Sequence, residues 1–475
     1  MATRREFLQT SAAAIAVSAT KPIIGWQGQG ANNRVRMAVI GCGNRAARVF
    51  DSFIRSGGDG VQYVAACEVN KARLDQWMTP ARQSFKLDVV GDYRRILDRK
   101  DVDAVLIGTP DFSHAPIMID AIAAGKDVYC EKPASNSIPR VNAMLDAYKK
   151  SDRVVQIGTH QRSWDHFIEA KKFVDDGTLG NVTQVIIVQP GSYARPKEAE
   201  AAVPAGLDWP MWQMDAPKKP FKPSRLGFRA WYDYGSGLVG DWGAHHVDVA
   251  HWFMNADNKV PLKTMANGAF LTVPDADPEM VPDSFSISWL YDNFLMTFAN
   301  GEAYTTNELE NWGVFFIGNR ASLQINRQGW AVRSVIAPVR NKQGVPPPPT
   351  AGGVTLGAGG VAIAAGGPGG APGGGRGAGG GGGRGGGRGA GGGGNAGFPA
   401  GESMVYVNPR GGVEEDYPLD VHTKNFLDCV KSRQKPNAHM EIGYHSALPC
   451  LLALESLAQG KPLGWDETAR KSKAL

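Results

Sequence analysis

The sequence predicts an α/β protein with two folded domains: a doubly wound parallel sheet, followed by an α/β domain with a large, open and mostly antiparallel sheet. Between residues 34 and 158, apolar strand-like runs alternate with helical stretches, which is typical of a parallel sheet wrapped by helices. After residue 180 such runs come closer together and lack crossover helices, which favours antiparallel pairing. The length of 475 residues also fits two domains.

The first domain is expected over residues 34–158 and the second over residues 159–475. Strands of the first are predicted at Val35–Ile40, Val61–Cys67, Val102–Ile107, Asp127–Cys130 and Val154–Ile157, with helices at Ile117–Ala124 and Ile138–Lys149. Strands of the second are predicted at Val182–Val188, Thr264–Val273, Phe285–Leu290, Phe294–Thr297, Val314–Ile317 and Ser403–Val407, with helices at His422–Lys431 and Tyr444–Ala458.

The first predicted strand runs into a glycine-rich turn that opens a helix. Gly41 permits the tight turn, Gly43 lets backbone approach a pyrophosphate, and the small Ala46 allows close packing of helix on strand. The free N–H groups at Asn44 and Arg45 face the phosphates. In this strand–turn–helix context the pattern predicts a dinucleotide-binding Rossmann domain.

Glu68 ends the second predicted strand, at the distance expected for a carboxylate that binds a ribose hydroxyl. It therefore favours NAD over NADP, although it could also be a solvated acid at a strand end. Arg45, beside the glycine turn, leaves NADP open because it could bind a 2′-phosphate.

Residues 345–399 consist almost entirely of glycine, alanine, proline and a few arginines. Such a segment cannot bury enough apolar surface to offset its conformational entropy, so we expect a disordered insertion in the second domain. Its arginines among glycines superficially resemble an RNA-binding tract, but a solvated insertion is the better interpretation.

Residues 1–33 have the features of a twin-arginine signal and linker. Arg4 and Arg5 precede a mild apolar stretch, and small residues follow before Pro22. We expect the twin-arginine machinery to export the folded protein to the periplasm, with an amphipathic N-terminal helix as the alternative. Because nicotinamide is a cytoplasmic cofactor, we further expect it to be tightly held or regenerated within each cycle.

Charge and cysteine content restrict the remaining classes. The net charge of +5 is small for this length and implies neither nucleic-acid nor membrane-surface binding. The five cysteines have no metal-like spacing, and folding before export would leave them reduced, so no disulfide is expected. No apolar run beyond the signal reaches bilayer-spanning length.

Polar residues follow the third and fourth predicted strands, at the edge where a doubly wound sheet binds its ligands. Thr109, Pro110 and His114 are expected to contact the nicotinamide half of a cofactor. Glu131 and Lys132 follow the fourth strand, and an ammonium there can stabilise the alkoxide character that develops as hydride leaves a carbinol carbon. A surface Lys132–Glu131 pair is the structural alternative.

A second cluster covers residues 240–252. Helical spacing places Asp241, His245 and Asp248 on one face, so His245 could accept a hydroxyl proton while Asp241 orients its imidazole or binds a neighbouring hydroxyl. A zinc site of His245, His246, Asp248 and His251 is less favoured because adjacent histidines diverge by about 100° on a helix. We expect no metal.

In these motifs the chain resembles the Gfo/Idh/MocA family, which includes glucose-fructose oxidoreductase and inositol 2-dehydrogenase. The motifs that carry the resemblance are Gly41-Cys42-Gly43-Asn44-Arg45, Gly108-Thr109-Pro110, Glu131-Lys132-Pro133 and Asp241-Trp242-Gly243-Ala244-His245. The resemblance implies a catalytic trio of Lys132, Asp241 and His245, a cis bond before Pro133, and substrates among sugars and cyclitols. It also implies a homo-oligomer, a dimer or a tetramer.

Substrate contacts are assigned to residues whose flat or polar side chains suit a sugar ring. They are Arg162, Trp209, Arg229, Trp231, Tyr232 and Asp248. The aromatic members could equally form a core or a subunit interface.

The main functional hypothesis is an NAD(P)-dependent oxidoreductase acting on the CH–OH group of a sugar, cyclitol or derivative. A first alternative is redox-neutral glycoside cleavage or elimination through a transient keto-sugar, as the family contains such enzymes. A second is a non-catalytic sugar-binding or scaffold protein.

Overall fold

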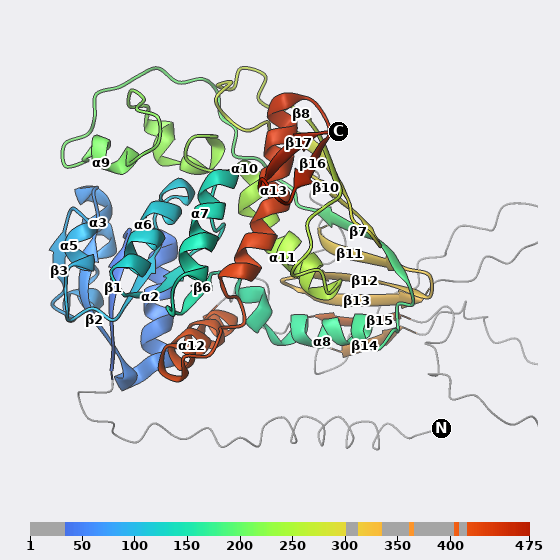
Figure 1. Cartoon of the computed structure of the whole chain (residues 1–475), viewed down its shortest axis with the longest axis horizontal. Coiled ribbons are helices and arrows are strands. Elements are labelled where there is room, and N and C mark those ends of the chain that lie inside the picture. Colours follow the sequence, from blue (N-terminus) through green and yellow to red (C-terminus); the bar gives the residue numbers. More distant parts are fainter. Residues whose placement is uncertain (1–33, 301–311, 335–360, 365–402, 408–415) are drawn as a thin grey trace, which may run out of the picture.

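The computed structural model describes residues 34–300, 312–334, 361–364, 403–407 and 416–475. It has an N-terminal layered domain and a C-terminal domain built on a large sheet, with helices packed between them (Figure 1). The predicted export signal lies outside the described residues, as does the predicted disordered insertion except for residues 361–364.

The first domain is a doubly wound Rossmann fold, as predicted. Its sheet has the strand order β3-β2-β1-β4-β5-β6, and every neighbouring pair is parallel. The strands are β1 (Val35–Ile40), β2 (Val61–Cys67), β3 (Asp88–Val90), β4 (Ala104–Ile107), β5 (Asp127–Cys130) and β6 (Val155–Ile157). The helices around it are α2 (Asn44–Gly57), α3 (Lys71–Trp77), α4 (Pro80–Gln83), α5 (Arg94–Leu97), α6 (Asp111–Ala123) and α7 (Ile138–Lys149).

The second domain is built on a mixed, mostly antiparallel sheet, again as predicted. Its order is β14-β15-β13-β12-β11-β7-β10-β9-β8-β16-β17, and the β7–β10 pair is parallel. The strands are β7 (Val182–Val188), β8 (Lys263–Ala269), β9 (Ser284–Leu290), β10 (Leu295–Ala299), β11 (Gly313–Gly318), β12 (Ala321–Asn326), β13 (Gly329–Ser334), β14 (Val361–Ala364), β15 (Ser403–Val407), β16 (Leu463–Asp466) and β17 (Lys471–Ala474).

Helices α8 (Asp165–Asp175), α11 (Gly243–Phe253) and α13 (Met440–Gln459) pack against this sheet, on the side that faces the Rossmann domain (Figure 1). Helix α13 also contacts α7, so it ties the two domains together. The short helices α9 (Trp209–Gln213) and α10 (Gly237–Asp241) belong to a long segment between β7 and α11.

Helix α12 (Asp416–Ser432) comes late in the chain but packs on α2 of the first domain, where Phe426 joins the apolar core with Phe53 and Tyr129. One expectation about organisation needs correction. Strand β14 lies inside the segment predicted to be wholly disordered. Its residues Val361–Ala364 form a short apolar run without glycine or proline. This run pairs with β15 as an edge strand, so its backbone N–H and C=O groups find hydrogen-bond partners.

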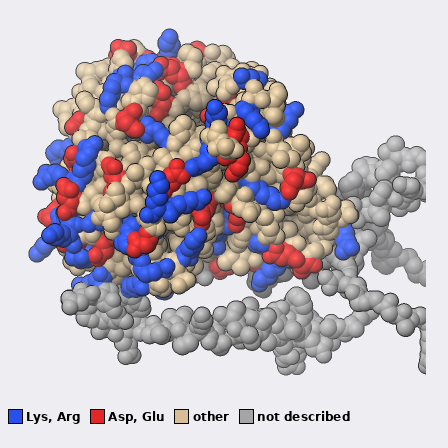
Figure 2. Space-filling view, in the orientation of Figure 1, with Lys and Arg blue, Asp and Glu red and all other residues tan. Residues whose placement is uncertain are grey.

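The surface seen in Figure 2 carries Lys and Arg side chains interspersed with Asp and Glu. Among the helices that the structure describes, none combines the length and hydrophobicity needed to cross a bilayer.

Candidate active site

A cavity of about 660 Å³ lies at the carboxyl edge of the parallel sheet, where the Rossmann domain meets α10 and α11. It brings together predicted site residues from both domains. Those that line it are Gly41, Gly43, Asn44, Arg45, Glu68, Thr109, Pro110, Glu131, Lys132, Arg229, Asp241 and His245. The wall also includes His160, Tyr193 and Arg327, which the sequence did not single out, and Asp111 and Trp242 from the segments around the predicted site residues.

The glycine turn has the geometry of a phosphate cradle. Gly41 has φ +86°, and a Cβ there would lie 2.6 Å from Thr109 Cγ2. A Cβ at Gly108 would lie 2.7 Å from the Cβ of Ala46, so helix and strand pack closely, as the small residue predicts. No side chain caps the start of α2 at Gly43, which leaves its first N–H groups available to an anion. These residues fit a dinucleotide.

Glu68 is fixed at the end of β2 by backbone donors. Its Oε2 accepts from Cys42 N at 2.8 Å, and its Oε1 accepts from the amides of Val69 and Asn70 at 2.9 Å. Burial raises the pKa of Glu68, and these three N–H groups oppose that rise. The carboxylate thus stands on the cavity wall beside the glycine turn, where a ribose would lie.

The guanidinium of Arg45 is engaged by Glu131 and lies beside His160. Its Nε donates to Glu131 Oε1 at 2.9 Å, and its Nη2 lies 3.3 Å from Nδ1 of His160. The attraction of the buried carboxylate draws the guanidinium toward the end of the cavity that holds Lys132.

Lys132 and Asp241 form an ion pair that joins the two domains. The Nζ–Oδ1 distance is 2.6 Å, Nζ also donates to the backbone oxygen of Asp241 at 3.0 Å, and both side chains are about nine-tenths buried. The peptide bond before Pro133 is cis, as the resemblance implied. The alternative in which Lys132 pairs with Glu131 on the surface is therefore wrong.

His114 lies behind this loop rather than on the cavity wall. Its ring nitrogens lie 2.8 and 2.9 Å from the carbonyl oxygens of Pro133 and Thr109. Because it is buried between the two loops, it holds them in place and does not reach the position predicted for direct cofactor contact.

Asp241 is surrounded by donors. Its Oδ1 accepts from Lys132 and from Arg229 Nε at 3.0 Å, while its Oδ2 accepts from the Tyr193 hydroxyl at 2.5 Å. Burial alone would raise its pKa, but the Lys132 and Arg229 charges with these hydrogen bonds hold the pKa of Asp241 well below its usual range. The carboxylate is therefore ionised.

The predicted pairing of Asp241 with His245 is wrong. Asp241 and His245 both line the cavity, but no hydrogen bond joins their side chains among the described residues. The carboxylate oxygens of Asp241 instead bind Lys132, Arg229 and Tyr193.

His245 stands in the first turn of α11, with its ring perpendicular to that of His160 at a centroid distance of 5.4 Å. Its Nδ1 is buried and has no hydrogen-bond partner among the described residues. Burial, together with the charges of Lys132 and Arg327, lowers the pKa of His245 well below its usual value. A neutral imidazole at neutral pH can accept a proton, as a general base must.

The histidines and acid of the rival zinc site have separate partners. His246 Nε2 lies 2.9 Å from Gln189 Oε1, Asp248 pairs with Arg162, and His251 Nε2 lies 2.6 Å from the Tyr291 hydroxyl. Within the described ranges, no group of three or more His, Cys, Asp or Glu side chains could hold a metal ion.

Five of the six predicted substrate residues lie off the cavity, and Arg229 alone lines it. Arg162 binds both Asp248 and Asp257, and this charged cluster lies off the cavity wall.

The predicted aromatic contacts serve a separate core. Trp209 stacks on Trp212, and Trp231 is buried beneath the Arg225 guanidinium at 4.1 Å. The half-buried Tyr232 packs at the edge of the large core cluster. These residues hold the segment between β7 and α11 together.

Fold and cavity together define a nucleotide-binding oxidoreductase whose site is completed by its second domain. Residues 35–159 match the profile of an "oxidoreductase family, NAD-binding Rossmann fold", and residues 166–308 match that of an "oxidoreductase family, C-terminal alpha/beta domain". The two matches cover more than half of the chain, which belongs to the Gfo/Idh/MocA family. Its first domain is an NAD-binding Rossmann domain.

Among curated relatives, the chain is 25% identical over 227 residues to inositol 2-dehydrogenase of Salmonella paratyphi B, a match covering 47% of this chain and 55% of that protein. It is 29% identical over 163 residues to levoglucosan dehydrogenase of Pseudarthrobacter phenanthrenivorans, covering 34% and 36% respectively. The chain thus spans little more than half the length of the first relative.

Solved structures agree with the fold. A levoglucosan dehydrogenase in complex with NADH and L-sorbose aligns with a TM-score of 0.59 and 16% identity, over 92% of this chain and all of the other. A myo-inositol 2-dehydrogenase from Lactobacillus plantarum aligns with a TM-score of 0.55 and 17% identity, over 91% of this chain and 99% of the other.

The pH dependence of stability offers a test of the charge arrangement at Asp111. Burial, with a smaller contribution from Asp241, raises its pKa to about 7, although Arg229, Lys132 and Ser236 oppose the rise. Between the unfolded pKa of about 3.9 and this folded value, the native state holds a proton that the unfolded state has lost, so stability falls as the pH rises.

Asp111→Asn removes this titration. The unfolding free energy of wild type should fall with rising pH, and that of the variant should not. The difference, variant minus wild type, should therefore rise by on the order of 3 kcal/mol from pH 4 to pH 8, as measured by urea denaturation across that range. Parallel curves for the two proteins would show that Asp111 is ionised throughout.

Proposed function

We propose that the protein is an NAD-dependent oxidoreductase that moves a hydride to or from the CH–OH carbon of a sugar, cyclitol or sugar derivative. The observation that carries the proposal is the meeting of Lys132 from one domain and His245 from the other on the wall of one cavity, which the glycine turn also lines. Similarity to inositol and levoglucosan dehydrogenases supports this substrate class.

In this proposal the bound nicotinamide supplies the hydride acceptor or donor. Lys132 holds the substrate oxygen and stabilises the negative charge that develops on it, while His245 takes the hydroxyl proton. Asp241 is a positioning residue: together with Arg229 and Tyr193 it fixes the ammonium of Lys132. The carboxylate of Glu68 favours NAD, because a 2′-phosphate beside it would meet like charge.

Replacing Lys132 by Ala removes the group that stabilises the developing oxyanion. We expect kcat to fall by about 10²–10⁴-fold with nucleotide content unchanged, because the residues of the glycine turn do not depend on Lys132. Turnover is measured with the sugar or cyclitol that reduces the bound nucleotide, and nucleotide content by chromatography after denaturation.

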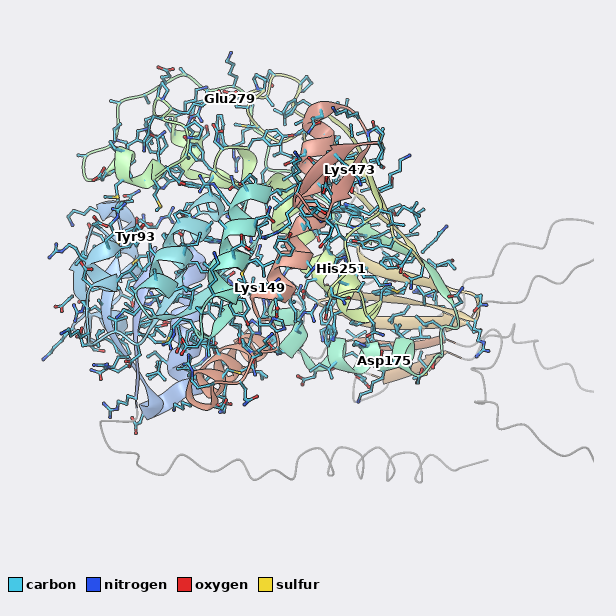
Figure 3. The ribbon with its side chains drawn as sticks, in the orientation of Figure 1. Tyr93, Lys149, Asp175, His251, Glu279 and Lys473 are labelled. Carbon is cyan, nitrogen blue, oxygen red and sulfur yellow. The ribbon has the colours of Figure 1, made fainter. Side chains whose placement is uncertain are left out.

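The control for this variant is Lys149→Ala, at the exposed end of α7 (Figure 3). This variant should retain wild-type turnover and wild-type nucleotide content. A Lys132→Ala protein with wild-type turnover would refute the assignment.

A second proposal concerns retention of the cofactor. Residues 204–216, here called the strap, lie over the Rossmann domain and include α9 (Figure 1). Lys71 N donates to Gly206 O at 2.8 Å, and Asp208 N donates to Val69 O at 2.9 Å, so the strap is bonded to the chain that follows Glu68.

Side chains of the strap close in on the nucleotide half of the cavity. Met211 and Met214 line it opposite Tyr93, which Figure 3 shows on the Rossmann side below α9. Contacts of a bound nucleotide with this strap would slow its release, which supports a resident cofactor recycled within the site.

Lys71→Pro tests the strap. Lys71 is the first residue of α3 and follows an extended Asn70, so proline is compatible with the helix but lacks the N–H that binds Gly206. Loss of one hydrogen bond of about 1 kcal/mol should speed nucleotide release about fivefold, measured by displacement with labelled NAD.

The matched control is Lys71→Ala, which keeps the N–H and loses only the exposed pair with Asp75. Equal release rates for the Pro and Ala variants would show that the strap does not retain the nucleotide.

A retained cofactor favours a second candidate function, redox-neutral glycoside cleavage or elimination through a transient keto-sugar. Such chemistry needs no exchange of nucleotide and no external oxidant. A purely sugar-binding or scaffold role is disfavoured, because it would not need the buried Lys132–Asp241 pair beside a neutral His245.

We also propose export to the periplasm by the twin-arginine machinery, on the basis of Arg4 and Arg5. Cell fractionation of a variant with both changed to Lys should show retention in the cytoplasm; unchanged export would refute the proposal.

Assembly into a dimer or tetramer is proposed from exposed leucines on the large sheet. Leu290 and Leu295 are paired across β9 and β10, and Leu262 lies beside them. Light scattering of the purified protein measures the mass of the particle in solution, and the mass of a single chain would contradict the proposed assembly.

A further inference from the structure

Arg229 is a cation on the cavity wall that the proposed hydride transfer uses only through its Nε atom. It lies in the short 3₁₀ helix Phe228–Ala230, within the segment between β7 and α11. Its Nε donates to Oδ1 of Asp241 at 3.0 Å, and its guanidinium carbon lies 4.8 Å from the centre of the Phe228 ring. The side chain lines the cavity and is 40% exposed, so the guanidinium is open to a ligand there.

The two terminal nitrogens of Arg229 have no hydrogen-bond partner among the described residues. Nη1 and Nη2 stand side by side at the end of the side chain, and their N–H groups form a planar fork. A carboxylate matches this fork, because its two oxygens accept two parallel hydrogen bonds. Since Asp241 already occupies Nε, a second carboxylate would bind the fork end-on.

Two neighbouring cations offer no such fork. Arg45 is bonded to Glu131 through Nε, and its Nη2 lies 3.3 Å from Nδ1 of His160. Lys132 carries an ammonium, which is a compact charge without a planar fork, and Asp241 holds it at 2.6 Å. Of these three cations, Arg229 is the one whose geometry suits a planar anion.

The charge of the described wall also favours an anion. Six cationic side chains and four carboxyls line this part of the cavity, namely Arg45, Arg48, Arg73, Lys132, Arg229 and Arg327 against Glu68, Asp111, Glu131 and Asp241. Burial and neighbouring cations lower the pKa of both His245 and Arg327, as expected in a positive field. An oxidised nicotinamide dinucleotide carries a single net negative charge, so it would leave this wall positive. Complementarity then favours an anionic substrate.

Asp111 lies near Arg229 but does not occupy its fork. The hydrogen bond that Asp111 accepts from the described residues comes from Ser236 Oγ at 3.2 Å. Burial raises the pKa of Asp111 to about 7, although the charge of Arg229 opposes the rise. At neutral pH this carboxyl therefore carries only part of a negative charge and does not cancel that of Arg229.

We propose that the substrate is a sugar acid, such as a uronate or an aldonate, and that Arg229 binds its carboxylate. The inference rests on the proposed hydride transfer and narrows its substrate class. Arg229 and Lys132 donate to the same oxygen of Asp241, so the bound carboxylate lies close to the ammonium that holds the reacting oxygen. The acid group and the oxidised carbon therefore belong to the same sugar unit.

Binding of the carboxylate also orients the substrate. With the acid group fixed by two parallel hydrogen bonds, the sugar loses the freedom to turn about its bond to Lys132, and the carbinol carbon is presented to the nicotinamide in one way. Arg229 is thus a specificity residue for the substrate, in addition to its contact with Asp241.

The test compares charged and uncharged forms of the same sugar. The purified protein with its nucleotide is mixed separately with D-glucuronate, D-galacturonate and their methyl glycosides, with D-gluconate and D-galactonate, and with the amide of each acid. Absorbance of the reduced nicotinamide gives the apparent second-order rate constant of nucleotide reduction. The charge preference is the ratio of this constant for an acid to that for its amide.

For wild type we expect a charge preference of about 10–100-fold with at least one of these acids, because hydrogen bonds to a charged group contribute that much. In Arg229→Gln the preference should fall to near unity, with nucleotide content unchanged. Arg229→Lys keeps the charge but loses the fork, so it should show an intermediate preference. The matched control is Arg333→Gln, an exposed arginine near the end of β13 that lies away from Arg327, and it should match wild type.

A purely structural Arg229 would act on Lys132 through Asp241. Its replacement by Gln would then slow the reaction of acid and amide alike and leave their ratio unchanged, which would overturn the inference. Loss of nucleotide with an unchanged ratio would also overturn it, because Arg229 would then serve the cofactor phosphates.

Two results with wild type separate this inference from the function on which it rests. Reduction by the amides, by the parent sugars or by myo-inositol that is as fast as reduction by every acid would overturn the inference and leave the dehydrogenase proposal intact. No absorbance change with any of these compounds would overturn the proposed function, and this inference with it.

Discussion

The buried ion pair between Lys132 and Asp241 is the constraint on which the site depends. Each partner comes from a different domain, and each is nearly inaccessible to water. Removing one partner of such a pair leaves an uncompensated buried charge and costs about 3–5 kcal/mol. The pair therefore fixes how the carboxyl edge of the parallel sheet faces α11, and with it the position of His245. Helix α13, which contacts both domains, and α12, which completes the core of the first, hold the same arrangement from outside.

The same charges set the protonation of the whole cavity. The ammonium of Lys132 and the guanidinium of Arg229 keep Asp241 ionised, and Lys132 with Arg327 disfavours a charged His245. Asp111 lies near the same charges but accepts only one hydrogen bond from the described residues. Burial therefore has the largest effect on its pKa and raises it. A fixed anion, a neutral imidazole and a carboxyl that titrates near neutrality thus share one wall. The proposed hydride transfer uses the first two.

Local patterns predicted much of the fold because they arise from periodicity and turn chemistry. Several strands, including β1, β2, β5 and β7, have the predicted bounds, since their mostly apolar runs are followed by glycine or by a polar or charged residue. The glycine turn and the Glu131-Lys132-Pro133 sequence could be placed because the carboxyl edge of a parallel sheet collects the residues that follow its strands. The same rule, applied to β6, would have singled out His160, and the segment predicted to follow β4 also contains Asp111.

What the sequence could not predict depends on contacts between distant segments. Asp241 binds Lys132 of the other domain rather than His245, a pairing that helical spacing within one segment could not predict. Trp209 and Trp231 have the composition of a sugar site yet form the core of their own segment, because aromatic side chains suit either role. The strap, and Arg327 at the β12–β13 turn, reach the cavity only through the tertiary fold.

The most direct test of a two-domain site is a crystal structure of the purified protein with its nucleotide and a bound sugar or cyclitol. The account predicts the carbinol carbon within about 3.5 Å of the nicotinamide C4. It also predicts that the oxygen on that carbon lies within hydrogen-bond reach of Lys132 Nζ and of the His245 ring. A nicotinamide outside the cavity, or a carbinol oxygen that neither residue contacts, would contradict it.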